Sequence, residues 1–346
     1  MKTVNIIGAG PAGNYLAYLL AGKFNVNVFE EHKEAGKPVH CTGIITNKIF
    51  QILNVPEDVI VNRVDRIRIH SRKKTLEINL KKPDIIVDRA KFDKFLFEIA
   101  RKKGAKYYFN HKLIGIKDKL IFEKKIVEKN ILVGADGANS LVSKSIGNRH
   151  KYYMGVQARV KIKQKDVDVF LNAGKFGWVV PEGNGICRMG VFSDLGNARN
   201  EFKKFVRKQP IEIQGGLIPI YNSKEIFQKG NTYVIGDAGS LVKATTGGGI
   251  VPGLMSAKIL ADCLINNRRY AWELRNVRLE LWLHLLLRRV LNNLEEKDAE
   301  KIIQIFGKKK NKKKIENVDR DSIGRMIFLL LKPRLVYLFL KGFMRF

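Results

Sequence analysis

Cysteine and histidine are scarce in this chain of 346 residues. The three cysteines, Cys41, Cys187 and Cys263, form no C-x-x-C pair and no even set, which excludes a disulfide framework and fits a reducing cytoplasm. The six histidines are scattered without metal-ligand spacing, so no metal site is expected. No apolar run reaches the roughly 20 residues that span a bilayer, and no signal peptide is expected before the apolar run that begins at Val4.

Acidic residues are also few, and the imbalance of charge is large. Asp and Glu number 33 against 64 Lys and Arg, which leaves a net charge of +31. A field of this sign favours a polyanionic surface, either an anionic membrane or a nucleic acid. The lysine-rich run at 308–314 fits a solvated loop equally well.

The first 30 residues predict a nucleotide-binding turn between a strand and a helix. A short apolar run from Val4 to Ile7 leads into G-x-G-x-x-G, and Glu30 follows at the end of the next apolar strand. Such glycines permit a tight turn and close approach of a pyrophosphate to the helix N-terminus, while the acid binds the ribose hydroxyls. The cofactor-binding residues expected here are Gly8, Gly10, Ala12, Gly13 and Glu30.

Two later glycine-containing segments predict further returns of the chain to the same ligand. They read VGADGANS at 133–140 and YVIGDAGSLVKATTGGG at 233–249. In this order, the three segments indicate one chain that folds three times onto FAD. The last glycines permit close approach to the flavin at the start of an apolar helix, whose positive end favours an anionic ring. The residues expected there are Gly247, Gly248, Gly249 and Ile250.

These segments resemble those of the geranylgeranyl reductases, within the FAD enzymes shaped like para-hydroxybenzoate hydroxylase. The resemblance covers about residues 1–265. Asp136 and Gly137 match the family's DG motif, and Asp237 matches the acid of its GD motif, which reaches the ribityl hydroxyls. Arg89, in the segment DRAKFD, matches an arginine that lies near the flavin side of the cofactor.

Two more segments carry the resemblance into the substrate site. GKPVHCTG at 36–43 is similar to the family's P-x-x-C-G stretch near the flavin ring, although Thr42 follows Cys41 here. FGWVVP at 176–181 is similar to the Y-x-W-x-F-P motif that lines the isoprenoid channel, with Phe176 in place of tyrosine and Val180 in place of the second aromatic. The resemblance implies Cys41 beside the cofactor, Cys41 and Trp178 as catalytic, and Phe176, Trp178 and Pro181 as substrate-binding.

The expected fold is α/β with mixed α+β content, in three parts. Residues 1–150 and 230–265 form a Rossmann-like FAD-binding domain, with a β-hairpin inserted near 60–85. Residues 151–229 form an inserted, antiparallel β-rich substrate domain. Residues 266–346 form a basic, helical C-terminal region, which carries 20 Lys and Arg and 9 Asp and Glu.

The expected activity is FAD-dependent reduction of carbon–carbon double bonds in polyprenyl chains, within archaeal-type membrane lipid synthesis. Cys41 is expected to position the alkene or relay its proton, although a flavin-bound proton or an ordered water serves as well. Both Cys41 and Trp178 also fit ordinary packing roles. No second nucleotide fingerprint is evident, so a ferredoxin or reduced nicotinamide is expected as an external electron donor.

The partners are expected to be a polyprenyl lipid and the anionic inner face of the cell membrane. Two apolar blocks at 325–346, broken at Pro333, predict a segment in the membrane interface, or else a helical hairpin packed on the enzyme. Two other functions remain open. An aromatic-ring monooxygenase would share the FAD motifs, and a basic flavoprotein could bind RNA, although no RNA-binding aromatic signature is visible and nucleic acid is not the expected partner.

Overall fold

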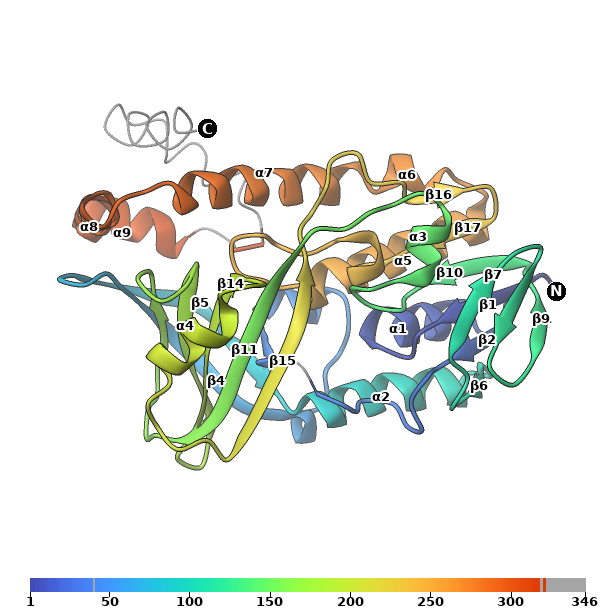
Figure 1. Ribbon diagram of the computed structural model, residues 1–346, viewed down its shortest axis with the longest axis horizontal. Coiled ribbons are helices and arrows are strands. Elements are labelled where there is room, and N and C mark those ends of the chain that lie inside the picture. The colour runs from blue at the N-terminus through green and yellow to red at the C-terminus, as the bar shows by residue number, and fades with distance from the viewer. Residues whose placement is uncertain (40, 318–319, 322–346) are drawn as a thin grey trace. The chain divides into compact units, whose positions relative to one another are not determined.

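The computed structural model describes residues 1–39, 41–317 and 320–321. The chain forms two compact units whose segments alternate along the sequence (Figure 1). The first unit comprises Met1–Val39, Asp88–Lys151 and Ile218–Trp282. The second comprises His40–Val87, Tyr152–Leu217 and the described residues from Leu283 onward.

A six-stranded sheet forms the centre of the first unit. Its strands are parallel except for the edge pair β16–β17. Val4, Ile6 and Val133 are fully buried, as expected for parallel strands that are covered on both faces. In sheet order the strands are β16 (Gln228–Lys229), β17 (Thr232–Val234), β10 (Ile131–Gly134), β1 (Thr3–Ile7), β2 (Asn25–Phe29) and β6 (Lys106–Tyr108).

Helices and a small antiparallel sheet complete the first unit. Helix α1 packs against both α2 and α5, and α3 packs against β10. The helices are α1 (Pro11–Leu20), α2 (Arg89–Lys102), α3 (Leu141–Ser145), α5 (Ile250–Asn266) and α6 (Tyr270–Glu273), with a 3₁₀ turn η3 (Gly236–Gly239). The small sheet contains β7 (Leu113–Ile116), β8 (Lys119–Phe122) and β9 (Ile126–Glu128).

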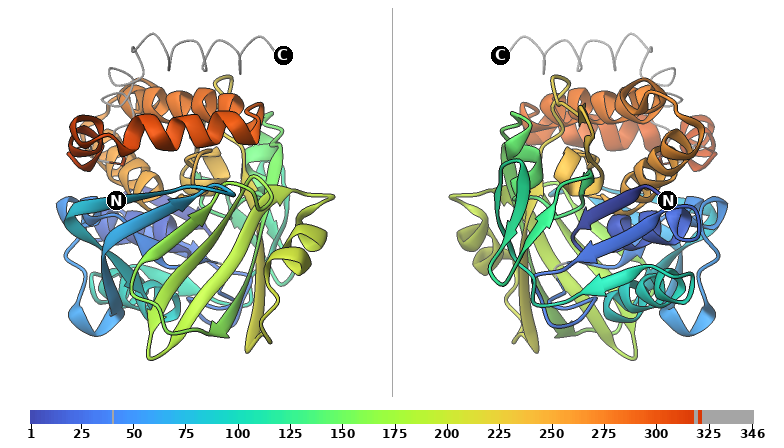
Figure 2. Two further views of the ribbon diagram at one scale, coloured as in Figure 1. Left: turned by 90° about the vertical axis from the view of Figure 1, so that its left-hand side faces the viewer. Right: turned by 90° about the vertical axis from the view of Figure 1, so that its right-hand side faces the viewer.

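An eight-stranded sheet forms the second unit (Figure 2). Its residues alternate between two faces, each with its own apolar cluster. Val180 and Trp178 pack on one face, whereas Val179 and Cys187 pack on the other. In sheet order the strands are β15 (Glu212–Pro219), β11 (Tyr152–Lys161), β14 (Ile186–Asp194), β13 (Phe176–Gly183), β12 (Val167–Phe170), β4 (Ile60–His70), β5 (Thr75–Val87) and β3 (Ile44–Ile45).

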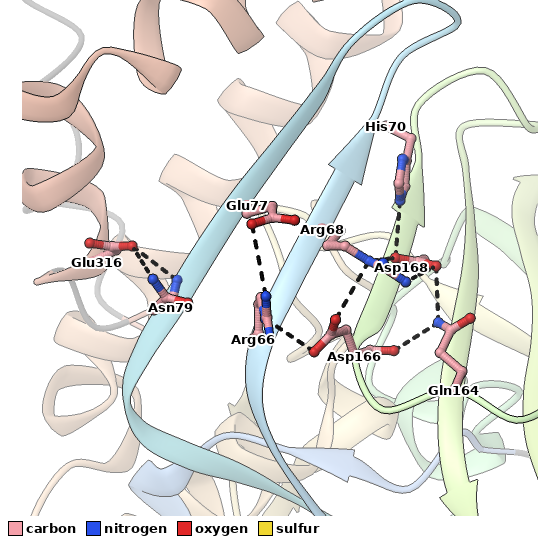
Figure 3. A network of polar contacts seen from close by, with 9 residues as sticks. All are labelled: Arg66, Arg68, His70, Glu77, Asn79, Gln164, Asp166, Asp168 and Glu316. Carbon is pink, nitrogen blue, oxygen red and sulfur yellow. Dashed lines mark hydrogen bonds and ion pairs between the residues drawn. The ribbon is translucent and has the colours of Figure 1, made fainter.

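The expected hairpin at 60–85 is present as β4 and β5, but it belongs to the second unit. Strand β4 pairs in parallel with β12 and so continues the eight-stranded sheet. Figure 3 shows the polar contacts around the junction of β4 and β12, which is called the β4–β12 seam below. The Arg68 guanidinium donates to both Asp168 oxygens at 2.6 and 3.0 Å, and the hydrogen bond raises the pKa of Arg68. His70 and Gln164 each contact the same carboxylate at 3.0 Å.

Helices cover parts of the second unit. Phe202 of α4 (Ala198–Phe205) packs on the Cys187 face. Ile303 and Phe306 of α8 (Glu296–Gly307) pack on Leu76 of β5, and α9 (Lys309–Glu316) follows. Two 3₁₀ turns, η1 (Asn47–Gln51) and η2 (Glu57–Val59), precede β4, and the boundary between the units falls within α7 (Arg275–Asn292).

The structure therefore divides the C-terminal region expected at 266–346. Residues up to Trp282 belong to the first unit, and α8 and α9 are part of the second unit's core. The lysine-rich run at 308–314 lies largely in α9, whose Glu316 accepts two hydrogen bonds from Asn79 of β5 at 3.1 Å (Figure 3). Within the described residues, no helix combines the length and apolarity needed to cross a membrane. The segment 325–346 lies outside the described residues.

Candidate functional site

The three glycine segments meet at one edge of the first unit's sheet. Ile7, Gly134 and Val234 are aligned in one row across β1, β10 and β17, and each segment turns directly after this row. Because the strands are parallel, their carboxyl ends share an edge, which is where α/β folds bind nucleotides. The Ala135 amide donates to Ile7 at 2.8 Å, which joins the first two turns. The predicted convergence of the segments is confirmed.

Two glycines of the first turn are required by the protein itself. Gly8 has a φ of +103°, and a Cβ there would overlap the carbonyl oxygen of Ala135. A Cβ on Gly13 would overlap the carbonyl oxygen of Gly8. These residues let α1 start directly against β1. Ala12 also packs closely, since its Cβ lies 3.1 Å from the position of a Cβ on Gly236.

Gly10 differs from Gly8 and Gly13 because no protein atom excludes a side chain at this position. Its φ is −75°, which any residue adopts, and a Cβ there would meet nothing within 4 Å. Gly10 is also the N-cap of α1, and no side chain caps this helix. The open space and the uncapped amides fit a bound pyrophosphate.

Asp237 lies at the third turn, in η3. No hydrogen bond from a described residue reaches its half-buried carboxylate. Burial raises the pKa of Asp237, while the charges of Arg89 and His150 act to lower it. A Cβ on Gly249, the uncapped N-cap of α5, would lie 2.7 Å from Asp237 Oδ1. This carboxylate is therefore available to bind ligand hydroxyls beside a helix N-terminus.

The residues between Asp237 and α5 form a glycine loop. Gly247 has a φ of +69°, and the Lys243 amide donates to the Gly248 carbonyl at 3.2 Å. Ile250 is the first residue of α5. The predicted loop before the apolar helix is confirmed, while its contact with a flavin stays a prediction.

Asp136 has a different environment from Asp237. Its carboxylate accepts from the Ser140 hydroxyl at 2.5 Å and from the amides of Leu141 and Val142 at 2.8 and 3.3 Å. It therefore binds the N-terminus of α3. Burial raises the pKa of Asp136, and these hydrogen bonds oppose the rise. Gly137 beside it has a φ of +73° and open space around its Cβ position. The cofactor contacts predicted for both residues stay predictions.

Glu30 and Arg89 are each held by a neighbour in the first unit. Glu30 Oε2 accepts from the Ala9 amide at 2.7 Å, and Oε1 contacts His32 Nδ1 at 2.6 Å. Arg89 donates to both oxygens of Asp93 at 3.1 and 3.0 Å. Burial raises the pKa of Asp93, against the charge of Arg89. The i, i+4 spacing of Arg89 and Asp93 on a helix was a signal that could have indicated this pair.

A buried pair behind the third turn was missed in the sequence. His150 Nε2 lies 2.7 Å from Glu225 Oε1, and the Ser240 hydroxyl donates to Glu225 Oε2 at 3.2 Å. Burial alone would lower the pKa of His150, but the hydrogen bond and the charge of Glu225 outweigh burial and raise this pKa. Because 75 residues separate the two, no local pattern indicates the pair.

In the second unit, the proposed substrate-wall residues lie on both faces of the sheet. Phe176 and Trp178 are two apart on β13 and share a face, with ring centroids 5.8 Å apart. The Phe176 ring stacks on Phe192 at 5.1 Å, and the Arg288 guanidinium lies 5.4 Å from it. Pro181, by contrast, is the cross-strand partner of Cys187. Pro181 therefore lies on the face opposite Trp178 and does not share a wall with it.

Trp178 is close-packed along its edge but lacks a polar partner. A Cβ on Gly190, its cross-strand partner, would lie 2.6 Å from Trp178 Cζ2. The buried indole N–H has no acceptor among the described residues. Its substrate-binding and catalytic roles stay predictions.

Cys41 is connected to the Trp178 face through Arg188. The Arg188 Nη1 donates to the Cys41 carbonyl at 2.9 Å, and Arg188 is the cross-strand partner of Val180. Residues 178 and 180 share a face by strand alternation. The Gly43 amide points to Cys41 Sγ at 3.4 Å. The structure thus brings Cys41 and Trp178 to one side of the sheet, and Arg188 is a functional candidate that the sequence did not indicate.

The chain is similar in sequence to several archaeal proteins, and in fold to a solved structure. It is 30% identical over 296 residues to the uncharacterized protein MJ1520 of Methanocaldococcus jannaschii, covering 75% of this chain and 74% of that protein. It is 27% identical to digeranylgeranylglycerophospholipid reductase 1 of Methanosphaera stadtmanae, covering 76% and 75%. A geranylgeranyl bacteriochlorophyll reductase-like protein from Thermoplasma acidophilum gives a TM-score of 0.83 at 20% identity, covering 97% and 98%. No protein-family profile matches the chain.

The fold and the three turns define the class of this protein as an FAD-dependent oxidoreductase. The chain belongs to the geranylgeranyl reductase family. The predicted fold class and FAD cofactor are confirmed at this level. Three features fit that cofactor: the open space at Gly10, the uncapped N-termini of α1 and α5, and the Asp237 carboxylate, which accepts no hydrogen bond from the described residues.

Proposed function

We propose that this protein is an FAD-dependent reductase that saturates carbon–carbon double bonds in polyprenyl chains, of the geranylgeranyl type, during synthesis of archaeal-type membrane lipids. The observation that carries the proposal is the shared sheet face of the second unit, to which Arg188 connects Cys41 and on which Trp178 lies. The name of the Methanosphaera relative supports the same substrate class.

The first unit would hold the cofactor. The uncapped N-terminus of α1 at Gly10 would bind the pyrophosphate, and Asp237 would accept hydrogen bonds from the ribityl hydroxyls. The N-terminus of α5 at Gly249 would favour negative charge on the flavin. When bound and reduced, the flavin supplies a hydride.

The second unit would hold the alkene against an apolar wall. An isolated alkene offers no polar handle, so its binding must come from apolar contact, at about 0.8 kcal/mol per buried CH₂. Trp178, which is partly exposed and packs beside the buried Val180, would present such a surface on the same face as Arg188. The wall would also exclude water from the reacting carbons.

Cys41 would hold the proton that the second alkene carbon requires. Saturation adds a hydride to one carbon and a proton to the other, so the thiol would give up its proton and regain one from water. The Gly43 amide at Sγ would stabilise the thiolate that is left. This assigns Cys41 a role that a small packing residue could not fill.

The substrate and its electrons would reach the enzyme from outside the chain. A lipid with two long polyprenyl chains stays in its bilayer, so the enzyme would work at the anionic inner surface of the cell membrane, to which its net charge of +31 draws it. An external donor, such as a ferredoxin or a reduced nicotinamide, would reduce the flavin.

The test is anaerobic turnover of digeranylgeranylglycerophospholipid by the dithionite-reduced holoprotein, followed by mass spectrometry of the extracted lipid. The proposal expects products that have gained two hydrogen atoms per double bond. Asp237→Ala should lower both bound FAD and turnover, while Cys41→Ala should lower turnover by about 100-fold and retain FAD. Lipid that is unchanged without oxygen but hydroxylated with oxygen would overturn the proposal.

A further inference from the structure

The turn that carries Cys41 is held at two atoms by different parts of the second unit. The Gly43 amide points to the Cys41 sulfur at 3.4 Å, and the Arg188 guanidinium donates to the Cys41 carbonyl at 2.9 Å. The chain then enters β3, whose residues Ile44 and Ile45 pair with β5. The thiol is half-buried, so its direction depends on this turn.

The Arg188 side chain has little freedom of its own. Arg188 is 5% exposed, and its Nε lies 3.3 Å from Glu182 Oε2. Burial alone would raise the pKa of Glu182, but hydrogen bonds from Arg159 and Arg188 outweigh it and hold the pKa below its ordinary value. Glu182 therefore stays ionised and anchors the guanidinium, whose planar geometry then directs Nη1 at Cys41.

The backbone beside Cys41 is shaped around this guanidinium. Gly43 has a φ of +72°, and a Cβ there would lie 3.0 Å from Arg188 Nη1 and would overlap the carbonyl oxygen of Val87. Only glycine leaves room for the guanidinium in this turn. Burying an arginine costs free energy that an apolar residue would avoid, so a role in packing does not explain its presence.

We propose that Arg188 is a positioning residue for Cys41, which fixes the Cys41 carbonyl and thereby the direction of its thiol. The guanidinium links Glu182 on β13, Cys41 before β3 and its own strand β14. The consequence for turnover rests on the proposed function, whereas the restraint on the thiol does not.

The test is the rate at which iodoacetamide alkylates Cys41 in the full-length holoprotein, followed by mass spectrometry. Arg188→Met should increase this rate about tenfold, because the turn opens more often without its hydrogen bond. Arg188→Lys should give an intermediate rate, since an ammonium cannot hold Glu182 and Cys41 in one planar geometry. Cys187 and Cys263, which are 0% and 2% exposed, are internal references and should stay unlabelled.

Arg159→Met is the matched control. Arg159 is the cross-strand neighbour of Arg188 and binds the same carboxylate, with further charge contact to Glu212. Its substitution should leave the Cys41 rate within about twofold of wild type. Equal acceleration by both variants, or labelling of Cys187, would show general loosening and overturn the proposal.

Misfolding of Arg188→Met and failure of the proposed function can each be distinguished from failure of the positioning role. If Arg188→Met does not fold, Arg188→Lys decides, and a Cys41 rate within about twofold of wild type overturns the proposal. In turnover, loss of positioning should lower kcat while KM changes little. If the wild type reduces no polyprenyl lipid but the labelling result holds, the proposed function fails and the positioning role stands.

Discussion

Glycine serves two opposite purposes within the first nucleotide-binding turn. At Gly13 the protein's own backbone excludes a side chain, whereas at Gly10 no protein atom does. We therefore expect Gly13→Ala to destabilise the fold by about 3 kcal/mol or more, because the added methyl group would overlap the carbonyl oxygen of Gly8. Gly10→Ala should leave the thermal midpoint of the flavin-free protein nearly unchanged, because its φ of −75° suits alanine.

The same Gly10→Ala change should still weaken FAD binding about tenfold or more, since the added methyl group occupies space that the pyrophosphate needs. Flavin absorbance after equilibrium dialysis measures this, and calorimetry of the flavin-free protein measures the fold. Full FAD affinity in Gly10→Ala would contradict the placement of the pyrophosphate.

His150 should make stability depend on pH. Its pKa is raised in the folded state, because Glu225 outweighs the opposing effect of burial. The stabilisation is therefore fully present below the ordinary pKa of about 6.5 and is lost as pH rises through the raised value. The free-energy difference between wild type and His150→Gln should be largest near pH 6 and should shrink by up to about 1.4 kcal/mol per pH unit above it.

Urea denaturation at a series of pH values measures this difference. Glu225→Gln is the matched variant, since it removes the charge that raises the histidine pKa. A difference that stays constant from about pH 6 to 9 would mean that folding does not raise the pKa of His150.

At the scale of elements, the β4–β12 seam depends on one carboxylate. Asp168 receives hydrogen bonds from Arg68, His70 and Gln164, and its side chain is 9% exposed. Asp168→Ala should cost about 2–3 kcal/mol, because it leaves these groups without their shared acceptor. Asp166→Ala is the control and should cost under about 1 kcal/mol, since its ion pairs with two arginines are longer, at 3.2 and 3.8 Å.

Urea denaturation of both variants, by circular dichroism, compares the two costs. Equal losses of stability in Asp168→Ala and Asp166→Ala would show that the seam relies on total charge rather than on the Asp168 hydrogen bonds.

Elements with a strong local pattern were predicted from the sequence. The turn after β1, helix α2 and the β4–β5 hairpin each follow from periodicity or glycine spacing within a few residues. The meeting of three segments at one sheet edge also followed, because each is a strand that ends in a glycine turn. The sequence did not indicate that Pro181 lies on the opposite face of the sheet from Trp178, where strand alternation places it.

The rest required contacts between distant residues. The parallel pairing of β4 with β12 assigns the hairpin to the second unit, and no property of the hairpin's own sequence indicates that partner. Arg188 and Cys41 are 147 residues apart, and His150 and Glu225 are 75 apart. Such pairs follow from tertiary packing, which local pattern and propensity do not specify.

At the scale of the whole molecule, charge and apolar sequence should act separately on a membrane. The net charge of +31 should attract the protein to anionic vesicles, and this attraction weakens as the Debye length falls from about 10 Å at 0.1 M salt to about 3 Å at 1 M. The apolar blocks at 325–346 should supply a part of the binding that salt barely screens.

Sedimentation with vesicles at several salt concentrations checks this prediction. Deleting 325–346 should remove the salt-resistant fraction and leave FAD bound, with uncharged vesicles as the control for the charge term. Loss of FAD or aggregation on deletion would mean instead that this segment belongs to the core.

The alternation of the two units along the chain has a consequence for synthesis on the ribosome. Six segments give five passages between units, and each unit needs residues from early, middle and late parts of the chain. The first unit lacks a sheet strand until β17 has emerged, and the second lacks α8 and α9 until almost the whole described chain has emerged. The first unit is complete once Trp282 has emerged, while the second still lacks its last segment. Until β17 emerges, β10 has an unpaired edge, which is exposed during synthesis. The first unit should therefore be able to fold before the second, and the second should fold last, when α8 and α9 have emerged.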